Sequence, residues 1–209
     1  MGWINTAAVA AQRRQHVHDP IDVVRDAEGG AQLPTVRWRK GSNQDHPHLR
    51  SFVCTDQSQP GREPWAEEVE SWITDEGHLP GVRQVSEIRF HCGYIAARLA
   101  AVGTWRHDEE GPGATWWYFL PAMAIAWPYR GRGGWLADQT LERLLTEIDL
   151  DALRRGAAEI HVVARVHREN APAELLFAAA GFTRFAADDA GQHRAWRRRW
   201  GGVQDLELS

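Results

Sequence analysis

The chain has 209 residues, of which 43% are hydrophobic, and this length and composition fit one globular domain and exclude a largely disordered protein. A formal net charge of −4 at pH 7 is too small to indicate nucleic acid as the partner of the whole surface. No apolar run approaches the roughly 20 residues that cross a bilayer. The first residues also lack the apolar centre of a signal peptide. We therefore expect a cytoplasmic protein without a membrane partner.

The sequence contains two cysteines, Cys54 and Cys92. Neither has a further Cys or His nearby at the spacing of a zinc site, and a single pair does not make a disulfide framework. We expect two core thiols and no metal.

The first part of the chain is weakly patterned. Residues 1–45 show no sustained apolar period, so we expect an N-terminal arm outside the core. A short strand is expected over residues 48–55. Residues 65–73 have apolar groups at helical spacing, which predicts a weakly packed helix, and the Pro- and Gly-containing residues 77–81 end it.

The middle of the chain predicts an antiparallel hairpin. Residues 85–90 alternate like a strand, residues 91–93 (HCG) resemble a hairpin turn, and residues 94–105 form a second, long apolar strand. A charged loop is expected over residues 106–113. Residues 116–126 are apolar, which predicts a third strand that is buried on both faces.

A long amphipathic helix is expected after this strand. One stripe of it is apolar and the opposite one is charged: Leu136, Leu141, Leu144, Leu145 and Ile148 against Glu142, Arg143, Glu147 and Asp149. Gly156 ends the helix. Residues 159–166 form a buried strand, and the strand–helix–strand order implies a parallel crossover.

Asn170 begins the last helix as its N-cap. The helix has an apolar stripe with the spacing i, i+3, i+4 and i+7, and Gly181 ends it. Residues 183–187 and 193–200 flank a turn and predict a closing antiparallel hairpin.

Residues 123–135 (MAIAWPYRGRGGW) are an apolar strand, a glycine- and arginine-rich turn, and the start of the long helix. Glycines let the backbone come close to a ligand, and the unpaired N–H groups and dipole of a helix N-terminus favour negative charge. Arg130 and Arg132 add two cations. The segment therefore predicts a phosphate-binding loop.

Two motifs resemble those of the GNAT superfamily of acyl-CoA-dependent N-acyltransferases, over roughly residues 48–200. The family's RxxGxG/A pyrophosphate loop corresponds to Arg130, Gly131, Arg132, Gly133, Gly134 and Trp135. The family's N-x-x-A…L-Y…G-F block corresponds to Asn170, Ala173, Leu176, Phe177, Gly181 and Phe182. Both motifs occur in the family's order, separated by one helix and one strand.

The resemblance implies an α/β (α+β) fold with a central, mixed, twisted sheet flanked by helices. The acetyltransferase domain would span residues 46–200, followed by a tail over residues 201–209. The apolar residues of the N-terminal arm leave open a contact with a second subunit in a homodimer.

The implied function is transfer of an acetyl group from acetyl-CoA to a primary amine, by direct attack in a ternary complex and without a metal. The acceptor would be the amine of a small molecule or a protein. The residues implied to bind the coenzyme are Met123, Ala124 and Ile125, which pair with the pantetheine arm; the loop Arg130, Gly131, Arg132, Gly133, Gly134 and Trp135; and Asn170, Ala173 and Phe177.

Three departures from the family leave the catalytic residues unassigned. Trp135 stands where the family has Gly or Ala. Phe177 replaces the Tyr that can protonate the leaving thiolate, and a phenyl ring has no proton to give. Phe119 and Pro121 occupy the usual base positions. The candidates for a base are water and the side chains of Glu87, His91, Asp108, Glu109, Glu110 and Tyr118.

Two other functions remain open. One is a module that binds coenzyme A or another nucleotide ligand without turnover, which the missing acid and base favour. The other is a protein directed to nucleic acid through residues 37–40 and 194–199, although nucleic acid is not the partner that we expect.

Overall fold

The structure is a computed structural model that describes residues 33–59, 61, 63–75, 88–111, 114–187 and 191–201. Residues 108–111 and 187 are described by their backbone. The expected C-terminal tail, apart from residue 201, lies outside the described residues, as do residues 1–32 of the expected arm.

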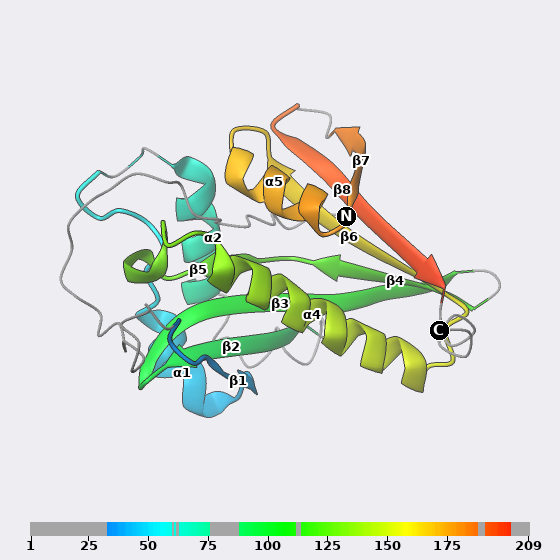
Figure 1. The fold of residues 1–209 in the computed structure, drawn as a ribbon, viewed down its shortest axis with the longest axis horizontal. Coiled ribbons are helices and arrows are strands. Elements are labelled where there is room, and N and C mark those ends of the chain that lie inside the picture. Colours follow the sequence, from blue (N-terminus) through cyan, green and yellow to red (C-terminus); the bar gives the residue numbers. More distant parts are fainter. Residues whose placement is uncertain are drawn as a thin grey trace, which may run out of the picture.

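The described strands form one mixed sheet of eight strands (Figure 1). The strand order is β1-β2-β3-β4-β6-β8-β7, and β5 pairs with β3. β4 and β6 are parallel, and the other pairs are antiparallel. The strands are β1 Arg37–Lys40, β2 Arg89–Ile95, β3 Arg98–Gly111, β4 Thr115–Leu120, β5 Met123–Ile125, β6 Glu159–His167, β7 Thr183–Ala187 and β8 His193–Gly201.

Helices cover both faces of the sheet. The α-helices are α1 His46–Arg50, α2 Pro64–Asp75, α4 Trp135–Arg154 and α5 Ala171–Ala179, and the 3-10 turns are η1 Asn43–Asp45 and η2 Trp127–Tyr129. α4 and α5 lie in front of the sheet in Figure 1. Trp72 of α2 stacks on Phe90 of β2 at 5.9 Å, and strand alternation turns the next residue, His91, toward α4. α2 therefore packs on the face opposite to α4.

The apolar stripe of α4 is buried, as expected: Leu136, Leu141, Leu144, Leu145 and Ile148. The helix comes so close to β3 that a Cβ atom at Gly103 would lie 2.9 Å from Leu144 Cδ1. Glu147 was expected on the exposed side, and this is wrong. Its side chain is buried and pairs with Arg143 at 2.6 Å and with Lys40 of β1 at 3.4 Å.

The second half of the chain matches the remaining predictions. β6 runs parallel to β4, and α4 ends just before Gly156, which has a φ of 70°. Asn170 Oδ1 accepts a hydrogen bond from Ala173 N at 3.2 Å and so caps α5. β7 and β8 form the closing antiparallel pair.

The region before β2 was predicted less well. Residues 48–55 were expected as a strand, but α1 covers residues 46–50, with Pro47 in the first helical turn, where proline is tolerated. α2 is present but is not weakly packed, since Ala66, Val69 and Ile73 are fully buried. The expected helix end at residues 77–81 lies outside the described residues.

The hairpin turn was placed wrongly at residues 91–93. These residues are inside β2, and the turn lies at Ala96 and Ala97. Gly93 is needed for packing, because a Cβ atom there would lie 2.7 Å from the ring of Trp38 in β1. The expected charged loop is also wrong over residues 106–111, which continue β3.

The predicted strand over residues 116–126 is broken at Pro121 and Ala122 into β4 and β5. Proline has no N–H group for the ladder. The N–H of Ala122 donates to Thr104 Oγ1 at 2.9 Å, in place of a backbone carbonyl. After the break β5 continues along β3, opposite residues 101–103.

Residues 37–45 were expected outside the core, and this is wrong. β1 pairs with β2, and the carboxylate of Asp45 is fully buried. It accepts hydrogen bonds from the Tyr94 hydroxyl, the Ser42 backbone N–H and the Arg39 guanidinium. The segment from β1 to η1 is therefore part of the sheet and its packing.

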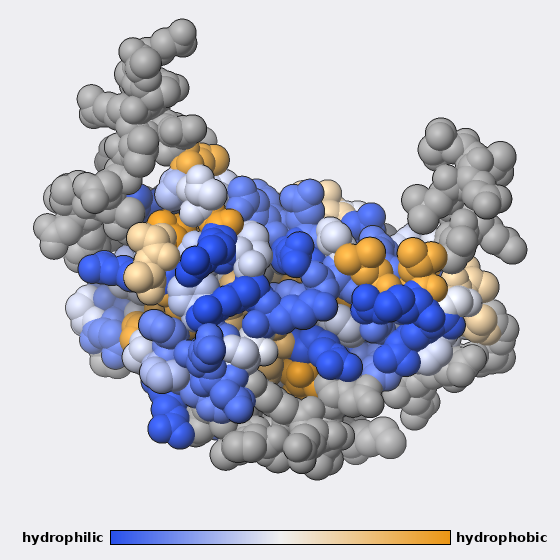
Figure 2. All heavy atoms as spheres, turned by 90° about the horizontal axis from the view of Figure 1, so that it is seen from below, coloured by the Kyte–Doolittle hydropathy of each residue, from blue (hydrophilic) through white to orange (hydrophobic). Residues whose placement is uncertain are grey.

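The described part of the face in Figure 2 is largely polar. Figure 2 views the molecule from below, where hydrophobic residues form separate spots among hydrophilic ones. Among the described residues, none of the helices has the length and apolar character to cross a membrane. Cys54 and Cys92 are buried and reduced, as expected for core thiols.

Burial of His91 predicts a pH-dependent stability. Its side chain is 1% exposed, Nε2 accepts a hydrogen bond from Trp105 Nε1 at 3.2 Å, and burial lowers the pKa of His91 from 6.5 to about 4. Between these two pH values the unfolded chain binds a proton that the folded protein does not, so stability falls as the pH falls. We expect a loss of up to about 1.4 kcal/mol per pH unit in this window.

Urea unfolding at pH 7, 6 and 5 measures this loss. The variant His91→Gln removes the titrating group, and its stability should depend less on pH over the same range. Equal pH dependence in the two proteins would contradict the prediction.

Candidate functional site

The sheet opens where β5 and β6 diverge. β4 is paired with β6 as far as Leu120 and Ala164, but β5 pairs with β3 while β6 continues beside β8 to His167. The opening begins at the break after Leu120. It lies beside the start of α4, because η2 and a short loop connect β5 to that helix.

The backbone of β5 presents hydrogen-bonding groups toward this opening. Ala122 O accepts a hydrogen bond from Thr104 N, and Ala126 N donates one to Ala100 O, both at 2.8 Å. Even-numbered residues of β5 therefore face β3. In an antiparallel ladder alternate residues face opposite edges, so Met123 and Ile125 direct their N–H and C=O groups toward β6. An extended ligand can pair with such an edge.

The loop before α4 uses left-handed glycines. Gly131, Gly133 and Gly134 have φ values of 76°, 81° and 82°, a region that glycine enters without steric cost. Gly134 is the N-cap of α4, and its carbonyl accepts the N–H groups of Ala137 and Asp138. A Cβ atom at Gly133 would meet nothing within 4 Å. The backbone there faces open space that a ligand can occupy.

A small pocket lies at this N-terminus. It is lined by Ile125, Tyr129, Arg130, Gly134, Trp135, Leu136 and Ala137. The end of β5 and the first turn of α4 therefore border the same hollow. The indole of Trp135, which replaces the family's small residue, forms part of its wall.

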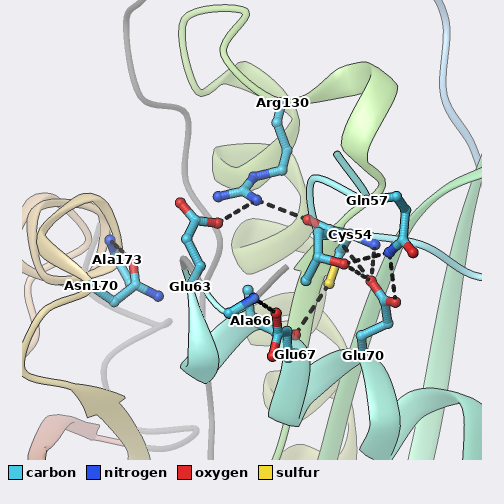
Figure 3. Close-up of polar contacts among 11 residues, drawn as sticks. Cys54, Gln57, Glu63, Ala66, Glu67, Glu70, Arg130, Asn170 and Ala173 are labelled. Atoms are coloured by element: carbon cyan, nitrogen blue, oxygen red, sulfur yellow. Dashed lines mark hydrogen bonds and ion pairs between the residues drawn. The ribbon is translucent and has the colours of Figure 1, made fainter. Parts of the chain in front are cut away.

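The side chain of Arg130 is engaged within the protein, and its predicted contact with a coenzyme stays a prediction. Its guanidinium donates to Cys54 O at 2.8 Å and to Glu63 Oε2 at 2.7 Å (Figure 3). It also lies over the ring of Trp127. The side chain is 10% exposed. Arg130 thus ties the loop to the N-terminus of α2, whereas Arg132 is exposed.

The two arginines predict different mutant phenotypes. Arg130→Ala removes two charge-assisted hydrogen bonds and leaves Glu63 without this partner, so we expect a loss of about 2–4 kcal/mol in the free energy of unfolding. Arg132→Ala should leave stability within about 0.5 kcal/mol. It should weaken CoA binding by about 3- to 10-fold, as expected for the loss of one exposed phosphate contact.

Urea unfolding and calorimetric titration with CoA separate the two effects. A stable Arg130→Ala variant would contradict the structural role. An Arg132→Ala variant with unchanged affinity would contradict its contact with phosphate.

Glu70 of α2 fixes the segment that Arg130 contacts. One carboxylate oxygen accepts the N–H of Cys54 at 2.7 Å and both the N–H and the hydroxyl of Thr55, at 2.9 and 2.8 Å (Figure 3). Burial raises the pKa of the Cys54 thiol, which keeps it protonated and unreactive. No local sequence signal points to Glu70, because its partners lie about one helix away along the chain.

Asn170 lies on the other side of the opening. Its Oδ1 caps α5, and Figure 3 shows the amide nitrogen directed away from α5, toward the side where Glu63 lies. Ala173 and Phe177 are fully buried, and Phe177 packs edge-on against Phe182 at 4.9 Å. A contact of these three residues with a coenzyme stays a prediction.

Two of the candidate bases are in unsuitable positions. His91 and Tyr118 are buried beneath α4. The hydroxyl of Tyr118 donates to Asp151 Oδ2 at 3.1 Å, and burial together with Asp151 raises the pKa of Tyr118 above its usual value. Glu87 lies outside the described residues, and Asp108, Glu109 and Glu110 belong to the part of β3 described by its backbone. The base stays unassigned.

The structure brings together a cluster that sequence reasoning missed, at the end of β6. The ring of Trp65 in α2 stacks on His167 at 5.3 Å, and His167 lies edge-on to His193 of β8 at 5.2 Å. Arg165 Nη2 is 3.3 Å from His193 Nδ1. Burial and the neighbouring His193 lower the pKa of His167, which favours the neutral form of its ring. The cluster borders the opening on the α2 face of the sheet.

Comparison with solved structures identifies the fold. The chain is similar to an acetyltransferase of the GNAT family from Desulfovibrio desulfuricans, with 20% identity, a TM-score of 0.50, and coverage of 80% of this chain and 99% of that one. It is similar to the PaiA N-acetyltransferase of Thermoplasma acidophilum in complex with coenzyme A (16% identity, TM-score 0.55, coverage 79% and 99%). A ribosomal-protein-alanine N-acetyltransferase of Escherichia coli matches with 16% identity, a TM-score of 0.51, and coverage of 80% and 94%.

No protein-family model and no curated protein matches the sequence. The architecture of the chain is nevertheless that of the GNAT acyl-CoA N-acyltransferases, with their mixed sheet flanked by helices. The fold that the two motifs implied is confirmed.

Proposed function

We propose that the protein is an acyl-CoA-dependent N-acyltransferase that transfers an acetyl group from acetyl-CoA to a primary amine. One observation carries this proposal: the open edge of β5 lies next to a left-handed glycine loop at the N-terminus of α4. The first suits an extended amide-containing chain, and the second suits a diphosphate. Coenzyme A contains both groups in this order.

The residues present fit the coenzyme. The N–H and C=O groups of Met123 and Ile125 would pair with the pantetheine arm. The loop at Gly133 and Gly134 and the first N–H groups of α4 would hold the diphosphate, with Arg132 as the added cation. The open space at Gly133 is what a close backbone contact with phosphate requires.

The acceptor amine would approach from the α2 face. Trp65 and His167 border the opening there, and Nδ1 of His167 accepts the N–H of Glu169 at 3.3 Å, which places the ring proton on Nε2. Nε2–H would then donate a hydrogen bond to an electronegative atom of the acceptor substrate, and this bond would orient the amine. Direct attack on the thioester needs mainly positioning and a polarised carbonyl, so water suffices as the final proton acceptor.

The second candidate is a module that binds coenzyme A without turnover. The buried phenyl ring of Phe177 favours it, since this ring stands where the family has a proton donor for the leaving thiolate. A binding module needs the glycine loop and the β5 edge but no acid.

An acceptor screen distinguishes the two functions. The protein is incubated with acetyl-CoA and panels of amino acids, polyamines, amino sugars and peptides with an N-terminal amine, and both thiol release and product mass are followed. An acetylated product supports the proposal, with Gly133→Val as the inactive control. CoA binding without any product supports the binding module. The absence of both CoA binding and an acetylated product would contradict both candidate functions.

A further inference from the structure

A buried tyrosine lies beside the glycine loop. Tyr129 of η2 is 6% exposed and lines the pocket at the N-terminus of α4, together with Ile125 and Gly134. Its position is fixed by the backbone, because Tyr129 N donates to Ala126 O at 2.9 Å. Among the described residues, none forms a hydrogen bond with the Tyr129 hydroxyl. Most buried hydroxyls in proteins have a partner, so this one indicates a place for a ligand.

Two arginines from different elements lie near this hydroxyl. Arg132 belongs to the glycine loop, and Arg98 begins β3 directly after the β2–β3 turn. Ala126 N donates to Ala100 O at 2.8 Å, so η2 starts opposite a residue only two positions along β3 from Arg98. Burial raises the pKa of Tyr129, and the charges of Arg98 and Arg132 counteract part of this rise. Both guanidiniums are therefore within electrostatic reach of the hydroxyl.

The two arginines can both contact a ligand. Arg98 and Arg132 are exposed, and within the part of the chain that the structure describes neither guanidinium forms an ion pair or a hydrogen bond. Arg130 of the same loop differs from them, because its side chain is held by Glu63. The Tyr129 hydroxyl keeps its proton at pH 7, since its pKa lies above the usual value, and it can donate a hydrogen bond. Two cations and one hydroxyl donor suit a phosphate group.

The diphosphate of a coenzyme does not account for all of these groups. Backbone N–H groups of the glycine loop and of α4, with Arg132, already suit the diphosphate. Arg98 comes from outside that loop, on the β3 side of η2. Coenzyme A carries a further phosphate on the ribose of its adenosine, which follows the diphosphate along the molecule. A phosphate monoester of this kind has close to two negative charges at pH 7.

We propose that Arg98 and Tyr129 bind the ribose phosphate of coenzyme A, beside Arg132 and the diphosphate. The inference rests on the proposed function, because it assigns a further part of the same ligand. The Arg98 guanidinium and the Tyr129 hydroxyl donate hydrogen bonds to the phosphate oxygens. Both residues lie outside the two sequence motifs, so the β2–β3 turn becomes part of the coenzyme site. The protein then selects coenzyme A over dephospho-CoA, which lacks only the ribose phosphate.

Calorimetric titration of the full chain with CoA and with dephospho-CoA tests this selection. We expect the unaltered protein to bind dephospho-CoA about 10-fold or more weakly than CoA. Arg98→Ala should weaken CoA binding about 3- to 10-fold, as expected for the loss of one exposed phosphate contact, and should change the affinity for dephospho-CoA less than about 2-fold. Arg89→Ala is the matched control. Arg89 is exposed at the start of β2, at the other end of the same hairpin, and its loss should leave both affinities unchanged.

Two further variants separate the ribose phosphate from the diphosphate. Tyr129→Phe keeps the buried ring and removes the hydroxyl, so it should weaken the binding of CoA about 3-fold or more and leave that of dephospho-CoA within about 2-fold. Arg132→Ala should weaken the binding of both ligands, because both carry the diphosphate.

Three results would overturn the proposal. The first is equal affinity of the unaltered protein for CoA and dephospho-CoA. The second is an equal loss for the two ligands in Arg98→Ala and in Tyr129→Phe, which would place these residues on the diphosphate. The third is the absence of CoA binding by the unaltered chain, and this result alone would also contradict the proposed function.

Discussion

Replacing Gly133 by valine should weaken CoA binding about 100-fold or more, the equivalent of roughly 2.7 kcal/mol. Two costs add up at this position. The φ of 81° is a left-handed conformation that costs a residue with a side chain about 1–2 kcal/mol or more, so the loop of the variant would relax out of it and CoA binding would have to restore it. The new side chain would also fill the open space that the diphosphate must enter. Calorimetric titration with CoA measures the loss.

Gly156→Val is the matched control for this substitution. Gly156 lies at the other end of α4 and has a φ of 70°, and a Cβ atom added there would likewise meet nothing within 4 Å. This variant should lose stability from the same backbone strain but bind CoA with normal affinity. Normal affinity in a folded Gly133→Val protein would remove the assignment of the loop.

Asp45→Ala should lower the free energy of unfolding by about 3–5 kcal/mol, as for other broken buried ion pairs. The carboxylate is fully buried, and the substitution leaves the Tyr94 hydroxyl and the Arg39 guanidinium without their acceptor. Urea unfolding at pH 7 measures the change. Glu142→Ala, at an exposed position of α4, is the control and should change stability by less than about 0.5 kcal/mol.

The contribution of the Asp45 carboxylate to the free energy of unfolding should also depend on pH. Burial raises the pKa of Asp45, but hydrogen bonds from Tyr94, Ser42 and Arg39 outweigh it, and the net pKa lies below the usual 3.8. Its contribution to stability is therefore complete above pH 3.8 and is lost as the pH falls through the lower, folded value. If Asp45→Ala costs less than about 1 kcal/mol at pH 7, residues 37–45 are as dispensable as the sequence pattern suggested.

The helices α4 and α5 were predictable because their signals are local. The stripe of α4, the N-cap at Asn170 and the glycines that follow these two helices are set by spacing within one segment. β1 has four residues and no apolar alternation, so its place in the sheet depends on β2, about 50 residues away. The same holds for Gly93, which looked like a turn residue but makes room for Trp38.

The candidate site was predictable in its backbone and less so in its side chains. The sequence of residues 130–135 by itself predicts the left-handed glycines and the start of the helix. The engagement of Arg130 with Glu63 and the gathering of Trp65, His167 and His193 depend on three or more segments meeting in space. Sequence spacing carries no information on such contacts, so this cluster and the ion pair of Arg130 were missed.

A crystal structure of the protein with bound CoA tests whether the edge of β5 and the glycine loop form the coenzyme site. We expect diphosphate oxygens within hydrogen-bonding distance of backbone N–H groups in residues 131–136, and a pantetheine arm paired with Met123 and Ile125 along the open edge of β5. CoA bound elsewhere, or a fully occupied crystal in which the diphosphate avoids this loop, would contradict it.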